Sequence, residues 1–144
     1  MPSGLRGAFA ADGAEIVLGD CYGSACAPHI LHSARRFFAA RGFSVAINAP
    51  YAGGFTTEHY GDPRRGRHAL QIEISRALYM DERRFCKKPA FAALADHLTD
   101  LVRHLASVVA ACIEKPGSRA AKKFATIPQA CRQSAAPLAP GSSD

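Results

Sequence analysis

The 144-residue sequence lacks the features that mark membrane, secreted and repeat proteins. No apolar run approaches the roughly 20 residues that a membrane-spanning helix needs. The N-terminus has no basic segment followed by an apolar one, as a secretory signal would, and no segment of the chain repeats. The five cysteines are odd in number and irregular in spacing, which argues against a disulfide framework. We therefore expect a cytoplasmic protein with reduced thiols and no membrane partner.

Acidic residues are scarce near the C-terminus, where most of the formal net charge of +6 is found. From residue 115 onward, five basic side chains face one acid, a net charge of +4, so the rest of the chain is close to neutral. The proline, serine and alanine content there is typical of a solvated disordered extension that binds polyanions at most weakly. We interpret residues 1–14 as a disordered start, 15–113 as one domain and 114–144 as a basic disordered tail, with no specific nucleic-acid partner.

Three segments near the N-terminus predict a strand–helix–strand unit. Residues 15–20 form a short β-branched run that ends at a glycine, and residues 43–48 alternate bulky and small side chains. Between them, residues 28–41 carry apolar side chains at steps of three and four, and Gly42 follows as a stop. Strands joined in this way are expected to pair in parallel. A second, longer helix is predicted to start at Pro89 and to be ended by Pro116 and Gly117, with both Val102 and Cys112 on its apolar face.

A glycine- and proline-rich segment, residues 49–68, separates these elements from a further strand. Its six glycines and prolines exclude a regular element of any length, and a loop of this size in a compact domain is usually functional or disordered. Residues 68–75 then alternate apolar and polar side chains. This alternation predicts a strand with Glu73 on the face opposite Leu70, Ile72 and Ile74.

Glu73 is the strongest candidate for a catalytic residue. A general base must be held within reach of a water and have its basicity tuned by its surroundings, and a strand position flanked by apolar residues provides both. The alternative interpretation is an exposed strand glutamate that pairs with Arg65 or Arg67.

Two further groups could bind an anionic ligand. Glycines allow backbone N–H groups to approach a ligand closely, and neighbouring hydroxyl and imidazole groups could donate to a carboxylate or phosphate; here the group is Tyr51, Gly53, Gly54, Thr56, Thr57, His59 and Tyr60. A tight turn without a ligand explains the glycines equally well, and the spacing fits neither a P-loop nor a dinucleotide fingerprint. The second group, Arg64, Arg65, Arg67 and Arg76, could clamp a carboxylate or could form a solvated basic face.

The metal candidates are weak. His97, Asp100 and His104 share one face of the predicted long helix, but the two imidazoles are two turns apart, about 10 Å along the axis. The simpler interpretation is a surface pair of Asp100 and His104. Cys21 and Cys26 have no second cysteine pair, so we interpret them as apolar or incidental thiols.

Residues 16–82 resemble the C-terminal half of the N-formylglutamate amidohydrolase family. The matching pieces are IVLGD, YGSACAP, GFSVAINAPYAGGFTTEHYG and HALQIEISRALYMDE, and a looser similarity continues to about Ala106. The combination of an NxPxxGG loop with LQIEIxRxLYMDE is long and specific.

The resemblance implies a fold, an activity and a set of site residues. The fold would be part of a phosphorylase/hydrolase-like α/β sandwich, similar to zinc carboxypeptidases, with a mixed sheet flanked by helices. The reaction would be hydrolysis of a formyl or other N-acyl group on a small acidic amino acid by a zinc-activated water. Glu73 would remove the proton from that water, and Asn48, Gly53, Gly54 and Arg76 would surround the substrate.

One departure from the family pattern limits what we expect of the isolated chain. The family's metal-binding HSG-type and DxHS-type motifs lie before the IVLGD strand, whereas residues 1–14 contain no histidine, and His59 and His68 match neither motif. We therefore expect a truncated chain that binds no zinc by itself and is inactive alone. An exposed sheet edge could then support self-association. The alternative function is an inactive binding or assembly module that keeps the loop for acidic ligands.

Overall fold

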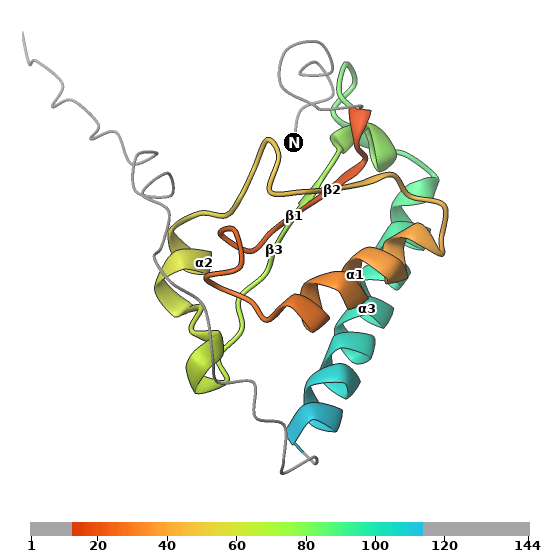
Figure 1. The fold of residues 1–144 in the computed structure, drawn as a ribbon. Coiled ribbons are helices and arrows are strands. Elements are labelled where there is room, and N and C mark those ends of the chain that lie inside the picture. Colours follow the sequence, from red (N-terminus) through yellow and green to blue (C-terminus); the bar gives the residue numbers. More distant parts are fainter. Residues whose placement is uncertain (1–12, 114–144) are drawn as a thin grey trace, which may run out of the picture.

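A computed structural model describes residues 13–113 of the chain (Figure 1). The segments predicted to be disordered, 1–14 and 114–144, therefore lie almost wholly outside the described residues, as does the proline–glycine pair predicted to end the long helix. The described part consists of a small sheet, two packed helices and a loop region with short helical turns.

The sheet has three short strands in the order β2-β1-β3: β1 (Ile16–Gly19), β2 (Val45–Ile47) and β3 (Gln71–Ile74). β1 pairs in parallel with β2 and antiparallel with β3, so the sheet is mixed. The prediction of a strand–helix–strand unit with parallel strands is confirmed. Each strand is shorter than its predicted segment. The larger two-sided sandwich stays a prediction, because α1 and α3 pack together on one side of this sheet (Figure 1).

Helix α1 (Pro28–Ala39) joins the two parallel strands. Its buried side chains include all five apolar residues that set the predicted period, namely Ile30, Leu31, Ala34, Phe37 and Phe38. Pro28 occupies the first turn, where its missing N–H costs no hydrogen bond. The chain leaves the helix through Gly42, which has a φ of 84° that glycine adopts readily. Pro28 therefore explains the start of the helix, and Gly42 explains why the chain turns away after its end.

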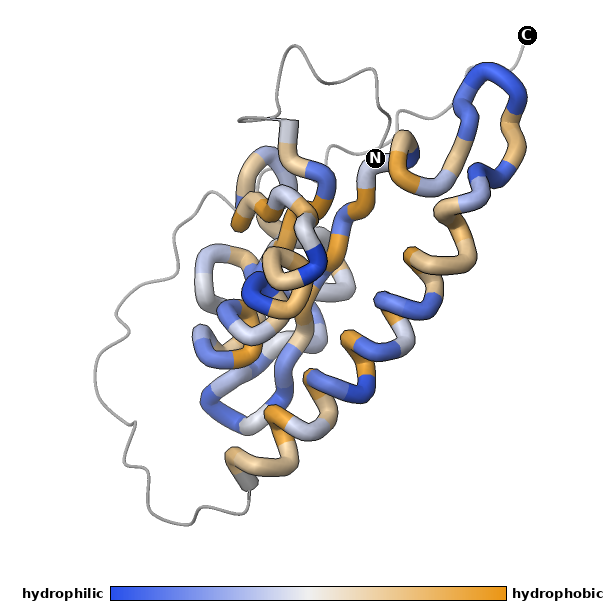
Figure 2. Tube along the Cα trace, turned by 90° about the vertical axis from the view of Figure 1, so that its right-hand side faces the viewer, coloured by the Kyte–Doolittle hydropathy of each residue, from blue (hydrophilic) through white to orange (hydrophobic). Residues whose placement is uncertain are grey.

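Helix α3 (Ala90–Ile113) packs beside α1. Its inward stripe is a leucine series at steps of three and four: Leu94, Leu98, Leu101 and Leu105. The prediction that Val102 and Cys112 also face inward is wrong, since Val102 is 68% exposed and Cys112 is exposed. One neighbouring helix covers only a narrow stripe of α3, and Figure 2 shows hydrophobic and hydrophilic residues alternating along it. No helix within residues 13–113 is long and apolar enough to cross a membrane.

The hydrophobic core lies between this helix pair and one face of the sheet. Phe38, Ile16 and Leu18 are fully buried at its centre, together with Leu101. Ile72 and Ile74 of β3 pack against this cluster, as predicted, which directs the intervening Glu73 to the opposite face. The sheet therefore separates an apolar side from a side that carries the polar groups of the candidate site.

The segment predicted to be an irregular loop contains a short helix, α2 (Phe55–Tyr60), and a 3₁₀ turn, η3 (Pro63–Arg65). The prediction that no regular element forms there is wrong over these residues. Gly54 and Gly61 flank α2 at its two ends, so the six residues between them are free of helix breakers. A second 3₁₀ turn, η4 (Arg76–Leu78), follows β3.

A short hairpin that the sequence analysis did not predict connects η4 to α3. It consists of β4 (Met80–Asp81) and β5 (Cys86–Lys87). Asp81 Oδ1 accepts hydrogen bonds from the backbone N–H groups of Arg83 and Arg84 at 3.0 and 3.1 Å, which closes the turn. Phe85 at the tip is 79% exposed.

We expect Phe38→Ala to lower the free energy of unfolding by about 3–5 kcal/mol, because it removes a fully buried ring and leaves a cavity. The matched control is Phe85→Ala at the exposed hairpin tip, which should change stability by about 0.5 kcal/mol or less. Urea unfolding followed by circular dichroism measures both. Equal effects of the two substitutions would contradict the position of the core.

Candidate functional site

The candidate site begins where the two parallel strands end side by side. Asp20 directly follows β1 and Asn48 directly follows β2. Asn48 Nδ2 donates to Asp20 Oδ1 at 2.7 Å, and Asn48 Oδ1 accepts the backbone N–H of Asp20 at 3.0 Å. Asp20 Oδ1 also accepts the N–H of Gly23, and Asp20 is only 2% exposed. This reciprocal pair, called here the Asp20–Asn48 pair, joins the carboxyl ends of the two strands.

The glycine-rich loop then crosses directly over the end of β1. Cys21 donates its backbone N–H to the carbonyl oxygen of Ala52 at 2.7 Å. A Cβ added at Gly19 would lie 2.7 Å from the Ala52 backbone, and one added at Gly53 would lie 2.6 Å from Cys21 Sγ. Gly53 also has a φ of 143°, which other residues rarely adopt. The close packing after β1 is therefore sufficient to require a glycine at position 53, whether or not a ligand binds there. The same packing holds the loop in place.

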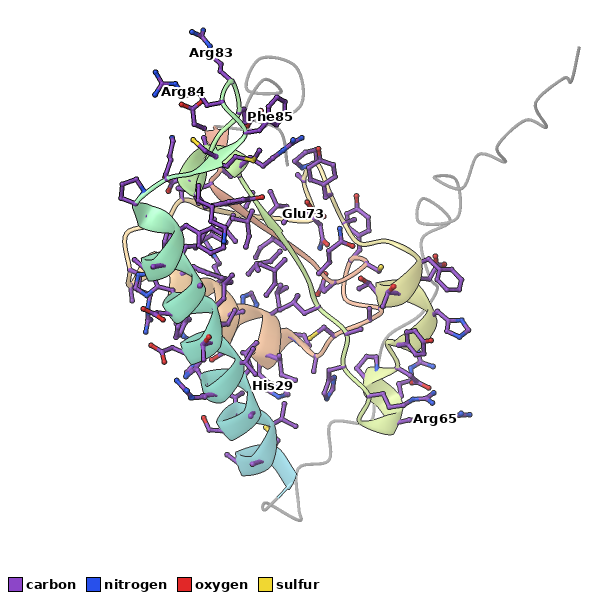
Figure 3. The ribbon with its side chains drawn as sticks, turned by 180° about the vertical axis from the view of Figure 1, so that it is seen from behind. His29, Arg65, Glu73, Arg83, Arg84 and Phe85 are labelled. Carbon is purple, nitrogen blue, oxygen red and sulfur yellow. The ribbon has the colours of Figure 1, made fainter. Side chains whose placement is uncertain are left out.

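Glu73 lies midway along the sheet, on its polar face and opposite Val17 of β1. Figure 3 shows it between Arg65 at one end of the molecule and the hairpin tip at the other. Its Oε1 accepts a hydrogen bond of 2.8 Å from Gln71 Nε2. The arginines of the alternative interpretation contact another acid: Arg65 and Arg67 lie 3.5 and 3.2 Å from Asp62.

The amide of Gln71 reaches from Glu73 to helix α2. Gln71 Oε1 accepts a hydrogen bond from Thr57 Oγ1 at 3.4 Å, and Thr57 is only 4% exposed. The Thr57 hydroxyl, a candidate ligand donor by sequence, therefore lies inside the protein and contacts Gln71. Thr56 beside it is exposed.

Arg76 lies at the other end of β3 from the glycine loop. The loop faces the Gly19–Gln71 end of the sheet. Arg76 begins η4 beyond Ile74, at the opposite end. There the backbone N–H of Ser75 donates to the carbonyl oxygen of Glu15. The structure thus brings Asn48, Gly53 and Gly54 together at one end, with Glu73 between them and Arg76. Arg76 is half-buried, and no ion pair is recorded for it within residues 13–113.

The aromatic and imidazole side chains of α2 point away from the loop's buried side. Phe55 and Tyr60 are 75% and 62% exposed. His59 stacks on Phe55 with ring centroids 5.1 Å apart and meets Tyr60 edge-on. His59 is thus part of an exposed aromatic cluster on the outer surface.

The thiols near the loop are buried. Burial, and then the nearby Asp20 carboxylate, raise the pKa of Cys26 to about 11. Cys21 and Cys26 are 2% and 0% exposed, in agreement with their interpretation as apolar side chains. Within residues 13–113, no three or more histidine, cysteine, aspartate or glutamate side chains are grouped so that they could hold a metal ion.

The remaining histidines pack against the helix α1 region. His104 Nε2 lies 2.8 Å from Ser33 Oγ, and His97 meets Phe43 edge-on. The predicted surface pair of Asp100 and His104 is replaced by an ion pair of Asp100 with Arg103 at 3.0 Å. The described histidines of α3 thus serve packing.

Partial burial, and then the neighbouring His29, lower the pKa of His68 below its ordinary value. The neutral ring can therefore accept the backbone N–H of Ala27 at Nδ1, over 3.4 Å. His68 ties the segment before β3 to the start of α1 and takes no part in the candidate site.

Sequence reasoning missed two residues that organise this site, Asp20 and Gln71, and interpreted Thr57 as a ligand donor. Both missed residues carried a readable signal. Asp20 and Asn48 each end a predicted parallel strand, so their side chains meet at one sheet edge. Gln71 stands two residues before Glu73 and therefore shares its face. The contact of Thr57 with Gln71 depends on the unpredicted helix α2.

Comparisons with known proteins identify relatives of this chain. Residues 1–80 match the model of the N-formylglutamate amidohydrolase family. The N-formylglutamate deformylases of Pseudomonas putida and Pseudomonas aeruginosa are each 38% identical over 66 residues, which cover 45% of this chain and 25% of each relative. The crystal structure of N-formylglutamate amidohydrolase from Ralstonia eutropha JMP134 has a TM-score of 0.70 at 33% identity, over 78% of this chain and 41% of that one. The matched region spans about a quarter of the curated relatives' length.

We expect Asp20→Ala to lower the free energy of unfolding by about 2–4 kcal/mol, since it leaves the amide of Asn48 and the N–H of Gly23 without their buried acceptor. Asp81→Ala is the matched control: Asp81 also accepts two hydrogen bonds, but it is partly exposed and water can replace it, so about 1 kcal/mol or less is expected. Chemical denaturation measures both. A loss no larger than that of Asp81→Ala would contradict the proposed importance of the Asp20–Asn48 pair.

Proposed function

This chain belongs to the N-formylglutamate amidohydrolase family, and on that basis we propose that it provides the catalytic carboxylate and substrate loop of an N-acyl amidohydrolase. The substrate class would be small amino acids with an acidic side chain and a formyl or similar acyl group on nitrogen. The observation that carries the proposal is the position of Glu73, which lies on the polar face of the sheet beside the glycine loop.

Glu73 acts in this proposal as the general base. A water attacks the carbonyl carbon of the acyl group while the carboxylate removes its proton. The Glu73 carboxyl group then gives this proton to the leaving nitrogen as the C–N bond breaks, which yields a carboxylic acid and the free amino acid. The rigid strand supports this role, because β3 fixes the Glu73 backbone and Gln71 fixes one carboxylate oxygen. For N-formylglutamate the products are formate and glutamate.

The residues around Glu73 bind the substrate in this proposal. Asn48, Gly53 and Gly54 provide polar and backbone groups at the loop end of the sheet. Arg76 provides a guanidinium at the other end, suited to a carboxylate of the substrate. A substrate with two carboxylates and an acyl group between these ends would place the acyl carbon near Glu73.

The proposal assigns no metal ligand to the described residues. Zinc is implied by the family resemblance, but residues 13–113 contain no suitable group of three side chains. No step of the proposed reaction in this chain therefore depends on a metal held by these residues alone. Zinc ligands would have to come from outside residues 13–113.

The sheet edges favour a second candidate function, an assembly module without activity of its own. β2 and β3 are the outer strands of the three-stranded sheet, and each pairs on one side with β1 within the described residues. Outer strands with unpaired backbone groups can pair with another chain. In this proposal the loop for acidic ligands is kept, and the chain associates through an outer strand.

We expect the purified 144-residue chain to contain less than one zinc per chain and to release no formate from N-formyl-L-glutamate. It should nevertheless bind this compound, with NMR shift changes centred on residues 48–54 and 71–76. Arg76→Met should weaken binding about tenfold, because it removes a charged hydrogen bond to the ligand.

Two controls make that experiment decisive. Arg83→Met removes a guanidinium at the hairpin tip, away from the site, and should leave binding unchanged (Figure 3). N-formyl-L-glutamine, which lacks the acidic side chain, should bind more weakly than N-formyl-L-glutamate. Turnover with one zinc per chain, abolished by Glu73→Gln, would show that the isolated chain is active; shift changes absent from both segments would refute the proposed site.

The assembly proposal predicts a stable dimer or larger complex in sedimentation at micromolar concentration. A proline in place of Ile72 or Val45 would remove a strand N–H that points away from β1, and the oligomer should dissociate more readily when the affected strand is the contact edge. A single monomeric species across the concentration range would count heavily against association through the sheet.

A further inference from the structure

The side chain of Gln71 connects the candidate base to the loop region through both ends of its amide. Nε2 donates to Glu73 Oε1 at 2.8 Å, and Oε1 accepts from Thr57 Oγ1 at 3.4 Å. We propose that Gln71 is a positioning residue, which orients the Glu73 carboxylate and couples it to helix α2 and the glycine loop. This inference rests on the proposed role of Glu73, but it concerns contacts that exist without substrate.

The strand register explains why the Gln71 side chain runs along the sheet toward Glu73. Gln71 lies opposite Gly19, and Glu73 lies opposite Val17 on the same face. The place above Gly19 is filled by the backbone of Ala52, which would lie 2.7 Å from any Cβ there. The crossing loop thus prevents the Gln71 side chain from extending over Gly19.

The chemistry of the two partners determines the orientation of the amide. A carboxylate only accepts hydrogen bonds, so the NH₂ end of Gln71 must face Glu73. The carbonyl end then faces Thr57, whose hydroxyl can donate. A reversed amide would place its oxygen against the carboxylate oxygen and lose the bond to Glu73. The contacts therefore specify one orientation of Gln71, and this in turn restricts the rotation of the Glu73 carboxylate.

The loop touches the same amide. A Cβ added at Gly54 would lie 3.4 Å from Gln71 Oε1, which is ordinary van der Waals contact. Gly54 also directly precedes α2, which carries Thr57. A movement of the loop on binding a ligand would therefore displace the Thr57 hydroxyl, the Gln71 amide and the Glu73 carboxylate together. Gln71 makes the orientation of the base dependent on the state of the substrate loop.

The test uses the isotope-labelled full chain and no turnover. The Glu73 side-chain carboxyl carbon is followed by NMR at one fixed pH in the wild type and in Gln71→Met, which keeps the length of the side chain and removes the amide. The amide donates to one carboxylate oxygen and so restricts the rotation of that group. Its loss should therefore shift the carboxyl carbon signal and increase the motion of the Glu73 side chain.

A matched threonine pair tests the other end of the amide. Thr57→Val removes the buried hydroxyl and should shift the Gln71 side-chain NH₂ signals, whereas Thr56→Val, at the exposed neighbouring position, should leave them unchanged. In the wild type these NH₂ signals should show the shift of a hydrogen bond to the Glu73 carboxylate, and Glu73→Gln should reduce that shift.

Three results would overturn the proposal: an unchanged Glu73 carboxyl signal in a folded Gln71→Met chain, equal effects of the two valine substitutions, or Gln71 NH₂ signals that do not change in Glu73→Gln. Should Gln71→Met not fold, the threonine pair and Glu73→Gln decide the question, because they leave Gln71 in place. The outcome is separate from that of the proposed function. A chain that neither binds nor hydrolyses N-formyl-L-glutamate could still show this coupling, and an active chain could lack it.

Discussion

The polar side of the molecule depends on the burial of one carboxylate, that of Asp20. A carboxylate that is 2% exposed is costly unless hydrogen bonds replace its water, and here the N–H of Gly23 and the amide of Asn48 do so. Because Asn48 also accepts the backbone N–H of Asp20, the two strand ends cannot separate without leaving several buried groups unsatisfied. The loop that follows Asn48 therefore starts from a fixed point.

The position of that loop determines the surroundings of Glu73. The backbone of Ala52 lies over Gly19, Gly53 lies against Cys21, and Gly54 lies against Gln71. The approaches at Gly19 and Gly53 need a residue without a side chain, so these glycines contribute to the site chiefly by allowing the loop to reach the sheet. Gln71 then extends this chain of contacts to Glu73.

The comparisons place these contacts in a family without defining the activity of this chain. The matched relatives are an amidohydrolase and two deformylases that act on N-formylglutamate by name, and the chain spans 25–41% of their lengths. Within residues 13–113, the structure offers a carboxylate, a polar loop and an arginine, but no group of metal ligands. The division between binding and metal chemistry is thus a question for experiment, whereas membership of the family is established.

Local pattern was sufficient for much of the fold and for the family. The period of α1, the alternation of β3 and the parallel strand pair follow from the spacing of apolar residues, since burial on one face imposes that spacing on the sequence. The LQIEI strand also placed Glu73 on the polar face. The motifs together determined the family by themselves.

Only the tertiary structure decided which polar groups meet. The pairing of Asp20 with Asn48 spans 28 residues and that of Thr57 with Gln71 spans 14, and no local period encodes such contacts. Helix α2 was not predicted because the two glycines at its ends are typical of loops. Val102 was predicted on the wrong face because, within residues 13–113, α1 covers only one side of α3. The sequence by itself determined which face the side chains of α1 and β3 take, since burial on one side of an element imposes its period on neighbours along the chain. The contacts across the sheet edge depend on how the loop crosses it, and that path is set by packing in three dimensions.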